Sequence, residues 1–353
     1  MRGKQLMQLC CLAFVSFIFF TYLVHGYTEE FEAAKKLYDQ KDYKGAIVPL
    51  EKHCTTYPKD NNGGYMLAQC YMKTKQYSKA IERLDIVLQH HPEDYKAQFL
   101  QGFLCLQTKK LDKALTHLKQ AAELKPDVAQ HQMVYGSALL QAKKTDEAVA
   151  VLKKAVDLEP TDPSINLEYG RALIFSGKNS EAVHPLEIAS KSSKTKNTAL
   201  TYLGTAYLSL KQADKAVSTL QQATQADPTE AKNFYYLGQA LELKMGDTGQ
   251  SIESYQPIIQ AYEKASDLDK DNAEYYFRHG FACESAAASV YEQSVQDEAV
   301  GQKALELLDK AKRAYQSALK IDPSHAAKDR ISAVDARIEA IKNPQVIEQE
   351  VDE

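Results

Sequence analysis

Histidines and cysteines are the side chains of this chain that could carry out chemistry, but their spacing matches no known catalytic or metal-binding pattern. His90 and His91 are neighbours, and adjacent residues on a helix do not face the same way. The sequence contains no His-Glu-x-x-His pair, no glycine-rich phosphate loop and no Gly-x-Ser-x-Gly turn. We therefore expect no enzyme activity, no metal site and no cofactor.

Four cysteines follow the N-terminal segment, at positions 54, 70, 105 and 283. Their spacing fits neither a zinc site nor a Cys-x-x-Cys motif. Cys54 and Cys70 fall in neighbouring predicted helices, so an oxidising compartment would allow a disulfide between them. Buried free thiols are the interpretation that we favour, and the sequence alone leaves both states open.

The helices that we predict for this chain belong to a repeating unit of 34 residues, and residues 129–162 are a clear copy of that unit. Large apolar residues recur in it at helical spacing and predict two short helices joined by a polar turn at 143–146. Pro160 ends the second helix, because the residue before a proline disfavours the α conformation. Small residues, Gly136, Ala148 and Ala155, stand where two antiparallel helices would have to approach closely.

The unit repeats at a fixed period. Alanine recurs at 46, 80, 114, 148, 182 and 216, glycine at 102, 136, 170, 204 and 238, and proline at 58, 92, 126, 160 and 228. A 34-residue helix–turn–helix period with small residues at these places resembles the tetratricopeptide repeat (TPR) family, over about residues 27–342. The resemblance implies an all-α fold, a right-handed α-solenoid of stacked repeats with elongated helices near its C-terminal end.

The domain organisation follows from this period. Residues 27–230 are expected to form six regular repeats. In residues 231–323 two atypical repeats follow, because Ala265 comes eight residues late and Ala311 nineteen residues late. The residues inserted into the second of these repeats are helix-forming and lack proline, so we expect longer helices rather than a loop. Residues 324–343 are expected to form a capping helix, and the acidic residues 344–353 a disordered tail.

The first 26 residues differ from the rest of the chain. Arg2 and Lys4 precede an apolar stretch at 6–24, and Val24 and Gly26 offer a cleavage site before Tyr27. The stretch is also just long enough to span a membrane. We favour a cleaved signal peptide over an uncleaved anchor. In both cases we expect export to a periplasmic or secretory compartment, with membrane contact only through residues 6–24 of an uncleaved leader.

The charge balance argues against nucleic acid as a partner. The chain has 43 basic and 47 acidic residues and a net charge of −4. Proteins that bind nucleic acid normally present a basic surface. A protein partner is therefore the expectation.

The TPR resemblance also implies where a partner would bind. In that family, positions 2, 5, 9 and 12 of the repeat face a concave groove lined by the first helix of each unit. The basic and asparagine residues with which some TPR proteins hold peptide tails are missing here. We expect an interaction scaffold that binds a peptide or helix, or alternatively a chaperone-like holder of unfolded or amphipathic segments. The predicted groove residues are Tyr65, Met66, Gln69, Phe99, Phe103, Leu106, Met133, Leu140, Arg171 and Tyr235.

Overall fold

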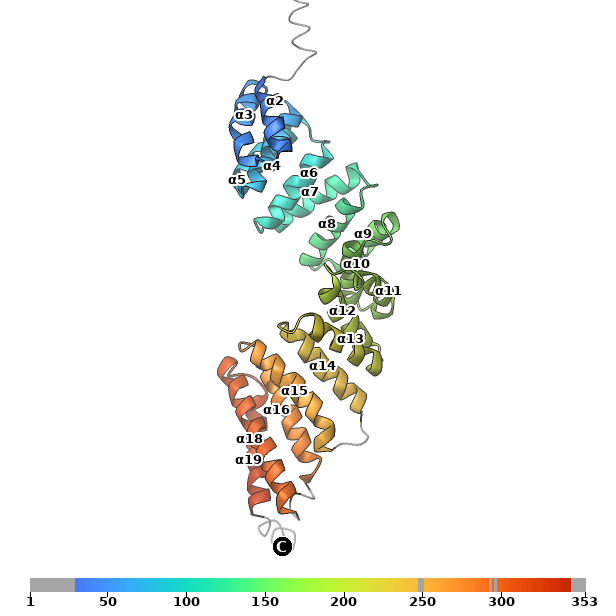
Figure 1. The fold of residues 1–353 in the computed structure, drawn as a ribbon, viewed down its shortest axis with the longest axis vertical. Coiled ribbons are helices and arrows are strands. Elements are labelled where there is room, and N and C mark those ends of the chain that lie inside the picture. The colour runs from blue at the N-terminus through green and yellow to red at the C-terminus, as the bar shows by residue number, and fades with distance from the viewer. Residues whose placement is uncertain (1–28, 247–250, 292–293, 295–296, 344–353) are drawn as a thin grey trace, which may run out of the picture. The chain divides into compact units, whose positions relative to one another are not determined.

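The computed structural model describes residues 29–246, 251–291, 294 and 297–343 (Figure 1). This part of the chain contains seventeen helices and no strand, which confirms the predicted all-α solenoid class. The predicted leader and the predicted acidic tail lie outside the described residues. The contacts divide the chain into two compact units, residues 1–151 and 152–353, called unit 1 and unit 2 below.

Unit 1 is a succession of helix pairs, each packed on the next. We call the first helix of a repeat its A helix and the second its B helix. The helices are α2 (Glu29–Asp39), α3 (Tyr43–Thr56), α4 (Asn61–Lys73), α5 (Tyr77–His90), α6 (Tyr95–Gln107), α7 (Leu111–Leu124) and α8 (Ala129–Gln141). The B helix α9 (Thr145–Leu158) crosses the boundary between the units.

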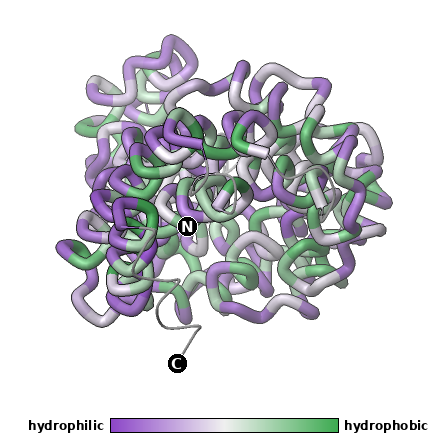
Figure 2. Tube along the Cα trace, turned by 90° about the horizontal axis from the view of Figure 1, so that it is seen from below, coloured by the Kyte–Doolittle hydropathy of each residue, from purple (hydrophilic) through white to green (hydrophobic). Residues whose placement is uncertain are grey.

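Unit 2 continues the pattern and then lengthens it. Its regular helices are α10 (Pro163–Phe175), α11 (Asn179–Ala189), α12 (Lys196–Ser209) and α13 (Ala213–Ala226). Its longer helices are α14 (Ala231–Met245), α15 (Ile252–Leu268), α16 (Ala273–Ala288), α18 (Glu298–Ile321) and α19 (Ala327–Lys342). Hydrophobic and hydrophilic residues alternate along the helices (Figure 2), as expected for helices buried on one side.

The A–B turns repeat one backbone conformation. After the A helices α2, α4, α6, α8 and α12, a lysine adopts a positive φ of 55° to 64°, and Gly177 takes this place after α10. The backbone N–H of the next residue donates to a carbonyl five residues back, for example Gln76 to Tyr71 at 2.8 Å. This Schellman closure normally uses glycine, because an L side chain in this conformation costs about 1 kcal/mol. The lysines are at positions 41, 75, 109, 143 and 211.

The predicted close approach of A and B helices is confirmed at the repeat glycines. A Cβ atom added to Gly204 would lie 2.5 Å from Cγ of Leu220 on α13. Gly102 faces Leu118 and Gly170 faces Leu186 in the same way. In each of these regular repeats the facing side chain, which we call the knob, comes sixteen residues after the glycine. The B-helix alanines at 46, 80, 114, 148, 182 and 216 are fully buried.

The two long repeats keep this contact with a larger knob. Gly238 faces Tyr262 and Gly280 faces Tyr315, at 24 and 35 residues, which exceed the regular spacing by eight and nineteen. Each tyrosine hydroxyl reaches a glutamate one turn beyond the glycine, Tyr262 to Glu242 at 2.8 Å and Tyr315 to a second glutamate at 2.6 Å. The added residues therefore fall between the glycine and the knob in the chain, and the described helices of these two repeats are longer than those of the regular ones.

The last helix is tied to α16 through a buried carboxylate. Glu284 is 3 % exposed and accepts hydrogen bonds from Tyr315 on α18 and from Arg330 and Arg337 on α19. Three donors compensate for removing this charge from water. Helix α19 starts at Ala327, three residues after the predicted start of the capping helix.

Candidate partner-binding site

The ten predicted groove residues all lie on A helices and are all partly exposed. Eight of them are in unit 1 and two, Arg171 and Tyr235, are in unit 2. Partial exposure fits both a binding role and edge packing against neighbouring helices. Their role as a partner-binding surface therefore stays a prediction, and the contacts of each unit decide which of them are best placed.

In unit 1 several of these residues already have internal partners. The Phe99 ring lies 4.7 Å from the His131 ring, and Phe99 packs with Leu106 on a small buried cluster. Gln69 accepts a hydrogen bond from the Tyr38 hydroxyl at 2.8 Å. Burial raises the pKa of Tyr65 to about 12. Packing within the unit therefore accounts for part of the apolar pattern read from the sequence.

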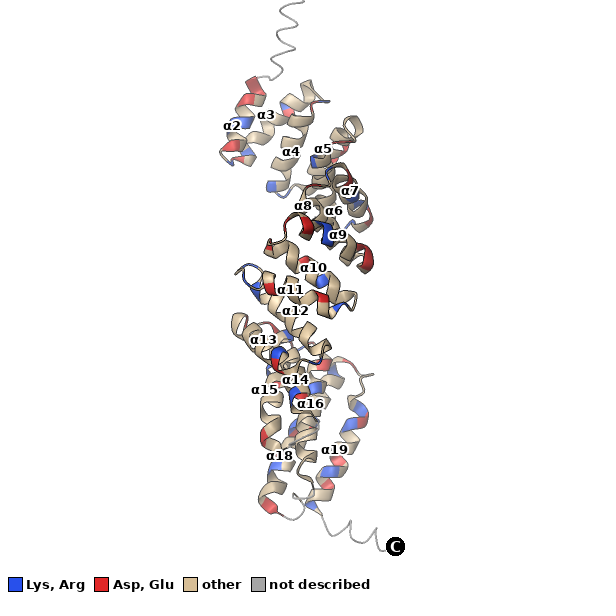
Figure 3. Cartoon of the chain, turned by 90° about the vertical axis from the view of Figure 1, so that its right-hand side faces the viewer, with Lys and Arg blue, Asp and Glu red and all other residues tan. Residues whose placement is uncertain are grey.

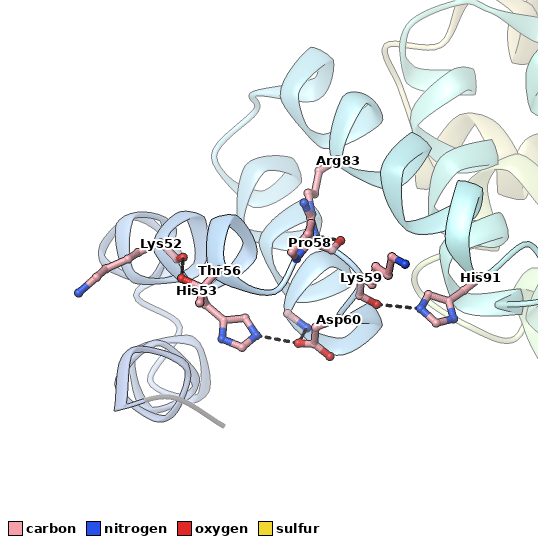
Figure 4. A network of polar contacts seen from close by, with 9 residues as sticks. Lys52, His53, Thr56, Pro58, Lys59, Asp60, Arg83 and His91 are labelled. Atoms are coloured by element: carbon pink, nitrogen blue, oxygen red, sulfur yellow. Dashed lines mark hydrogen bonds and ion pairs between the residues drawn. The ribbon is translucent and has the colours of Figure 1, made fainter. Parts of the chain in front are cut away.

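A polar network fixes the loop between α3 and α4 (Figure 4). An open cavity lined by Tyr65 and His91 lies next to this loop. Asp60 accepts hydrogen bonds from Gly63 N–H at the start of α4 and lies 2.8 Å from Nε2 of buried His53. Arg83 donates to the Pro58 carbonyl at 3.2 Å, and His91 lies 2.8 Å from the Lys59 carbonyl. The network ties one repeat to the next and supports the wall of the cavity, which the sequence did not predict.

Unit 2 contains a second cavity, of about 390 Å³, on the face formed by the A helices α10, α12 and α14. Phe175 stands at its wall with 55 % of its surface exposed, and its ring meets the Tyr202 ring edge-on at 6.1 Å. Tyr236 closes the aromatic wall from α14. The Arg171 guanidinium lies 5.7 Å from the Tyr202 ring centroid and is held by Glu168 at 2.7 Å. The pocket thus offers three aromatic side chains to an incoming group.

The polar part of this cavity is already organised. Thr201 donates a hydrogen bond to Oδ1 of Asn233 at 2.6 Å, and the Asn233 amide donates to the Ala223 carbonyl at 3.2 Å. At the rim, hydrogen bonds from Thr229 lower the pKa of the Asp227 carboxyl. The rim therefore carries an ionised carboxylate. On the cavity floor, the Asn233 side chain uses both its oxygen and its nitrogen in hydrogen bonds within the protein.

The structure places the two predicted residues of unit 2 differently. Arg171 borders the aromatic cavity through its contact with Tyr202. Tyr235 instead packs between repeats, with its ring 4.9 Å from the Tyr275 ring and its hydroxyl donating to Glu274 at 3.4 Å. Its neighbour Tyr236 lines the cavity. The sequence analysis did not select Phe175 or Tyr236 as groove residues. Phe175 could have been found from its position, because it is a large aromatic residue at the last position of an A helix, directly before the turn.

The cysteines are free and buried throughout the described residues, so Cys54 and Cys70 form no disulfide in this structure. Burial raises the pKa of both thiols to about 11, which makes them poor nucleophiles at neutral pH. Within the described ranges, no group of three or more histidine, cysteine, aspartate or glutamate side chains could hold a metal ion. None of the helices in this part of the chain is long and apolar enough to cross a membrane.

Comparison with known families identifies the repeat. Tetratricopeptide repeat models match residues 106–163, 167–231 and 139–192, and the model of anaphase-promoting complex, cyclosome, subunit 3 matches residues 39–121. Together the matches run from residue 39 to residue 231. This range contains the regular repeats described above. The chain belongs to the tetratricopeptide repeat family, which confirms the resemblance seen in the sequence.

Solved structures show the same fold. The C-terminal part of a TPR repeat-containing protein from Cytophaga hutchinsonii is 19% identical, with a TM-score of 0.54 over 75% of this chain and 98% of that one. The structure of pilF from Pseudomonas aeruginosa is 18% identical, with a TM-score of 0.50 over 58% of this chain and 93% of that one. Comparison with curated proteins finds no match.

Proposed function

We propose that this chain is an interaction scaffold that binds a peptide or helix of a partner protein on the face of its A helices. The aromatic cavity of unit 2 is the main anchoring point in this proposal. The observation behind this proposal is the exposure of Phe175, a large aromatic side chain that is 55 % exposed beside Tyr202 and presents apolar surface to solvent. Exposed aromatic patches of this kind usually mark interaction sites.

The surroundings of Phe175 suit one side chain of a bound segment. An apolar or aromatic residue would enter between Phe175, Tyr202 and Tyr236, and burying it there removes apolar surface from water. The exposed side chain of Asn197 on α12 is placed to bond the backbone of the same segment. The organised floor means that binding requires little rearrangement, and preorganisation of this kind raises affinity.

The test compares Phe175→Ala with a matched control. Proximity labelling in the native cell identifies the partner, and its affinity is then measured for both variants. Phe175→Ala should weaken binding by at least about tenfold, as expected for an aromatic hot spot, with an unchanged thermal midpoint. Leu124→Ala removes a side chain that is 40 % exposed on a B helix and should bind normally. Equal loss in both variants, or no loss in Phe175→Ala, would refute the proposed site.

A second candidate function is a holder of unfolded or amphipathic segments. Met66 and Met133 on the A helices of unit 1 favour it, because both are partly exposed and methionine adapts to irregular ligands. The two functions differ in a pulldown with the full chain. One stoichiometric partner supports the scaffold, whereas many unrelated unfolded chains support the holder.

We propose further that the chain is exported, on the basis of residues 1–26, which lie outside the described residues. The basic start, the apolar stretch at 6–24 and the small residues before Tyr27 support this. Cell fractionation with a C-terminal tag tests it. Recovery of the tagged chain in the cytosol, with residues 1–26 still attached, would contradict export.

A further inference from the structure

The A–B turns of unit 1 present a row of lysines that the proposed function does not use. Among the described residues, five lysines have a positive φ; four of them lie in this unit, one in each repeat, and all four are exposed. They hold equivalent positions in consecutive repeats, so they share the same edge of the unit. Figure 3 shows basic residues in blue, including the C-terminal end of α4. We call this row the turn lysines: Lys41, Lys75, Lys109 and Lys143.

Local structure does not explain the choice of lysine. Glycine would make the same turn without steric cost, as Gly177 does with a φ of 75° in the equivalent turn of unit 2. None of the four ammonium groups has an ion pair or hydrogen bond in the described part of the chain. A strained residue that recurs without an internal partner indicates an external function.

The charge around the row makes the edge basic. The turn segments 40–44, 74–78, 108–112 and 142–146 contain seven lysines and three aspartates. The loops at the other ends of the helices, 57–61, 91–95 and 125–129, contain two lysines and four acidic residues. Unit 1 therefore has one basic edge and one acidic edge, although the whole chain is acidic with a net charge of −4.

The spacing of the row fits an extended chain. Helices that pack directly lie about 8–10 Å apart, and consecutive A helices are joined mainly through the B helix between them, so we take roughly 10–15 Å as the separation of consecutive turn lysines. An extended polypeptide advances about 3.3 Å per residue, so a carboxylate at every third or fourth residue would match this spacing. The row also lies at the end of α2 opposite to Glu29, where the chain enters unit 1 from its N-terminal segment. A membrane held by the N-terminal residues would meet unit 1 at Glu29, at the other end of α2 from Lys41. This geometry favours an acidic segment of a protein partner over a membrane as the ligand of the lysine row.

We infer that the turn lysines form a docking surface for an extended, acidic segment of a protein partner, separate from the aromatic cavity of unit 2. Each carboxylate of the segment pairs with one or two lysines, and the contact is electrostatic and exposed. Its affinity must therefore fall as salt rises, because the Debye length drops from roughly 30 Å at about 0.01 M to roughly 3 Å at about 1 M.

The experiment uses the full chain and a fluorescent peptide of four Glu-Glu-Ser repeats, about 40 Å long when extended. The variant replaces all four turn lysines with glycine. Fluorescence anisotropy at low salt should show at least about tenfold weaker binding, the sum expected for four exposed ion pairs. The thermal midpoint should rise, because glycine relieves the strained backbone. Loss of binding therefore cannot come from loss of folding.

Two matched variants make the result specific. Replacing the turn lysines with arginine keeps the charge and should keep binding. A control with the same change in charge replaces four exposed lysines of unit 1 outside the A–B turns with glutamine: Lys35, Lys59, Lys96 and Lys119. If this control weakens binding as much as the glycine variant, only net charge acts and the docking surface is refuted. Lysine-dependent binding to anionic phosphatidylserine vesicles or to an oligonucleotide, without binding of the peptide, would also overturn it.

Discussion

Replacing Tyr262 with phenylalanine should expose how the long repeats are stabilised. Tyr262 is fully buried, and its hydroxyl donates a 2.8 Å hydrogen bond to the Glu242 carboxylate. The phenylalanine ring keeps the contact with Gly238, so only the hydrogen bond is lost. Hydrogen bonds to charged groups contribute about 1.5–3 kcal/mol, and we expect a loss of this size in the free energy of unfolding at neutral pH.

The pH dependence gives the prediction its sign. Burial raises the pKa of Glu242 above its ordinary value of 4.5, and the Tyr262 hydroxyl acts against this rise. A carboxyl whose pKa is raised in the folded state favours the fold at low pH, and this contribution is lost as pH rises above 4.5. Without the hydroxyl the pKa rises further. The destabilisation by Tyr262→Phe should therefore be larger at about pH 7 than at about pH 4, where a neutral bond of roughly 1 kcal/mol is lost.

Urea unfolding monitored by circular dichroism at both pH values measures these differences. Tyr255→Phe is the matched control, because Tyr255 is buried on the same helix and its hydroxyl makes no hydrogen bond among the described residues. This control should change the unfolding free energy by less than about 0.5 kcal/mol. An equal effect of both substitutions, or a loss from Tyr262→Phe that does not depend on pH, would refute the role assigned to the Tyr262–Glu242 bond.

Three further perturbations test other parts of the array. Gly204→Ala places a methyl group 2.5 Å from Leu220 and should cost about 1–3 kcal/mol in chemical unfolding, and an unchanged midpoint would refute the close contact. Burial lowers the pKa of His279 in the folded protein below 6.5. As pH drops below 6.5, His279 is protonated in the unfolded chain before it is protonated in the folded one, so stability falls. His279→Leu should flatten this fall by at most about 1.4 kcal/mol per pH unit, and an unchanged pH profile would contradict it. Arg337→Met removes one of three donors to Glu284 and should lower stability by about 1–3 kcal/mol, whereas an unchanged thermal midpoint would show that the other two donors suffice.

The fold could be predicted from the sequence because its constraints are local and periodic. Glycine recurs at Gly102 and its equivalents because a Cβ there would meet Leu118 on the facing helix. Alanine recurs at Ala114 and its equivalents because that side chain is fully buried. Helix ends follow from proline and polar turns, which act over a few residues. The delays of eight and nineteen residues also appear in the structure, as the longer distances from Gly238 and Gly280 to their knobs.

The binding face was harder to predict because it depends on the rotation of each helix. Tyr235 and Tyr236 are adjacent, and one residue turns the side chain by about 100° around an α-helix. The repeat pattern selected Tyr235, but that ring packs against Tyr275, and Tyr236 lines the cavity. The pattern also gave no reason to examine Lys75, because positive φ is normally recognised from glycine or asparagine.

The contact between glycine and knob has a consequence for how such arrays diverge. In α6, α10, α14 and α16 the glycine follows the first helical residue by seven positions, and in α7, α13, α15 and α18 the knob precedes the last residue by six. The base of the two long helix pairs therefore has the same length as the base of the regular pair α6–α7, and the added length lies between the glycine and the knob. Codons can be gained or lost there without a compensating change in a neighbouring repeat. Repeat size can therefore differ from one unit to the next without a change in the contact between glycine and knob.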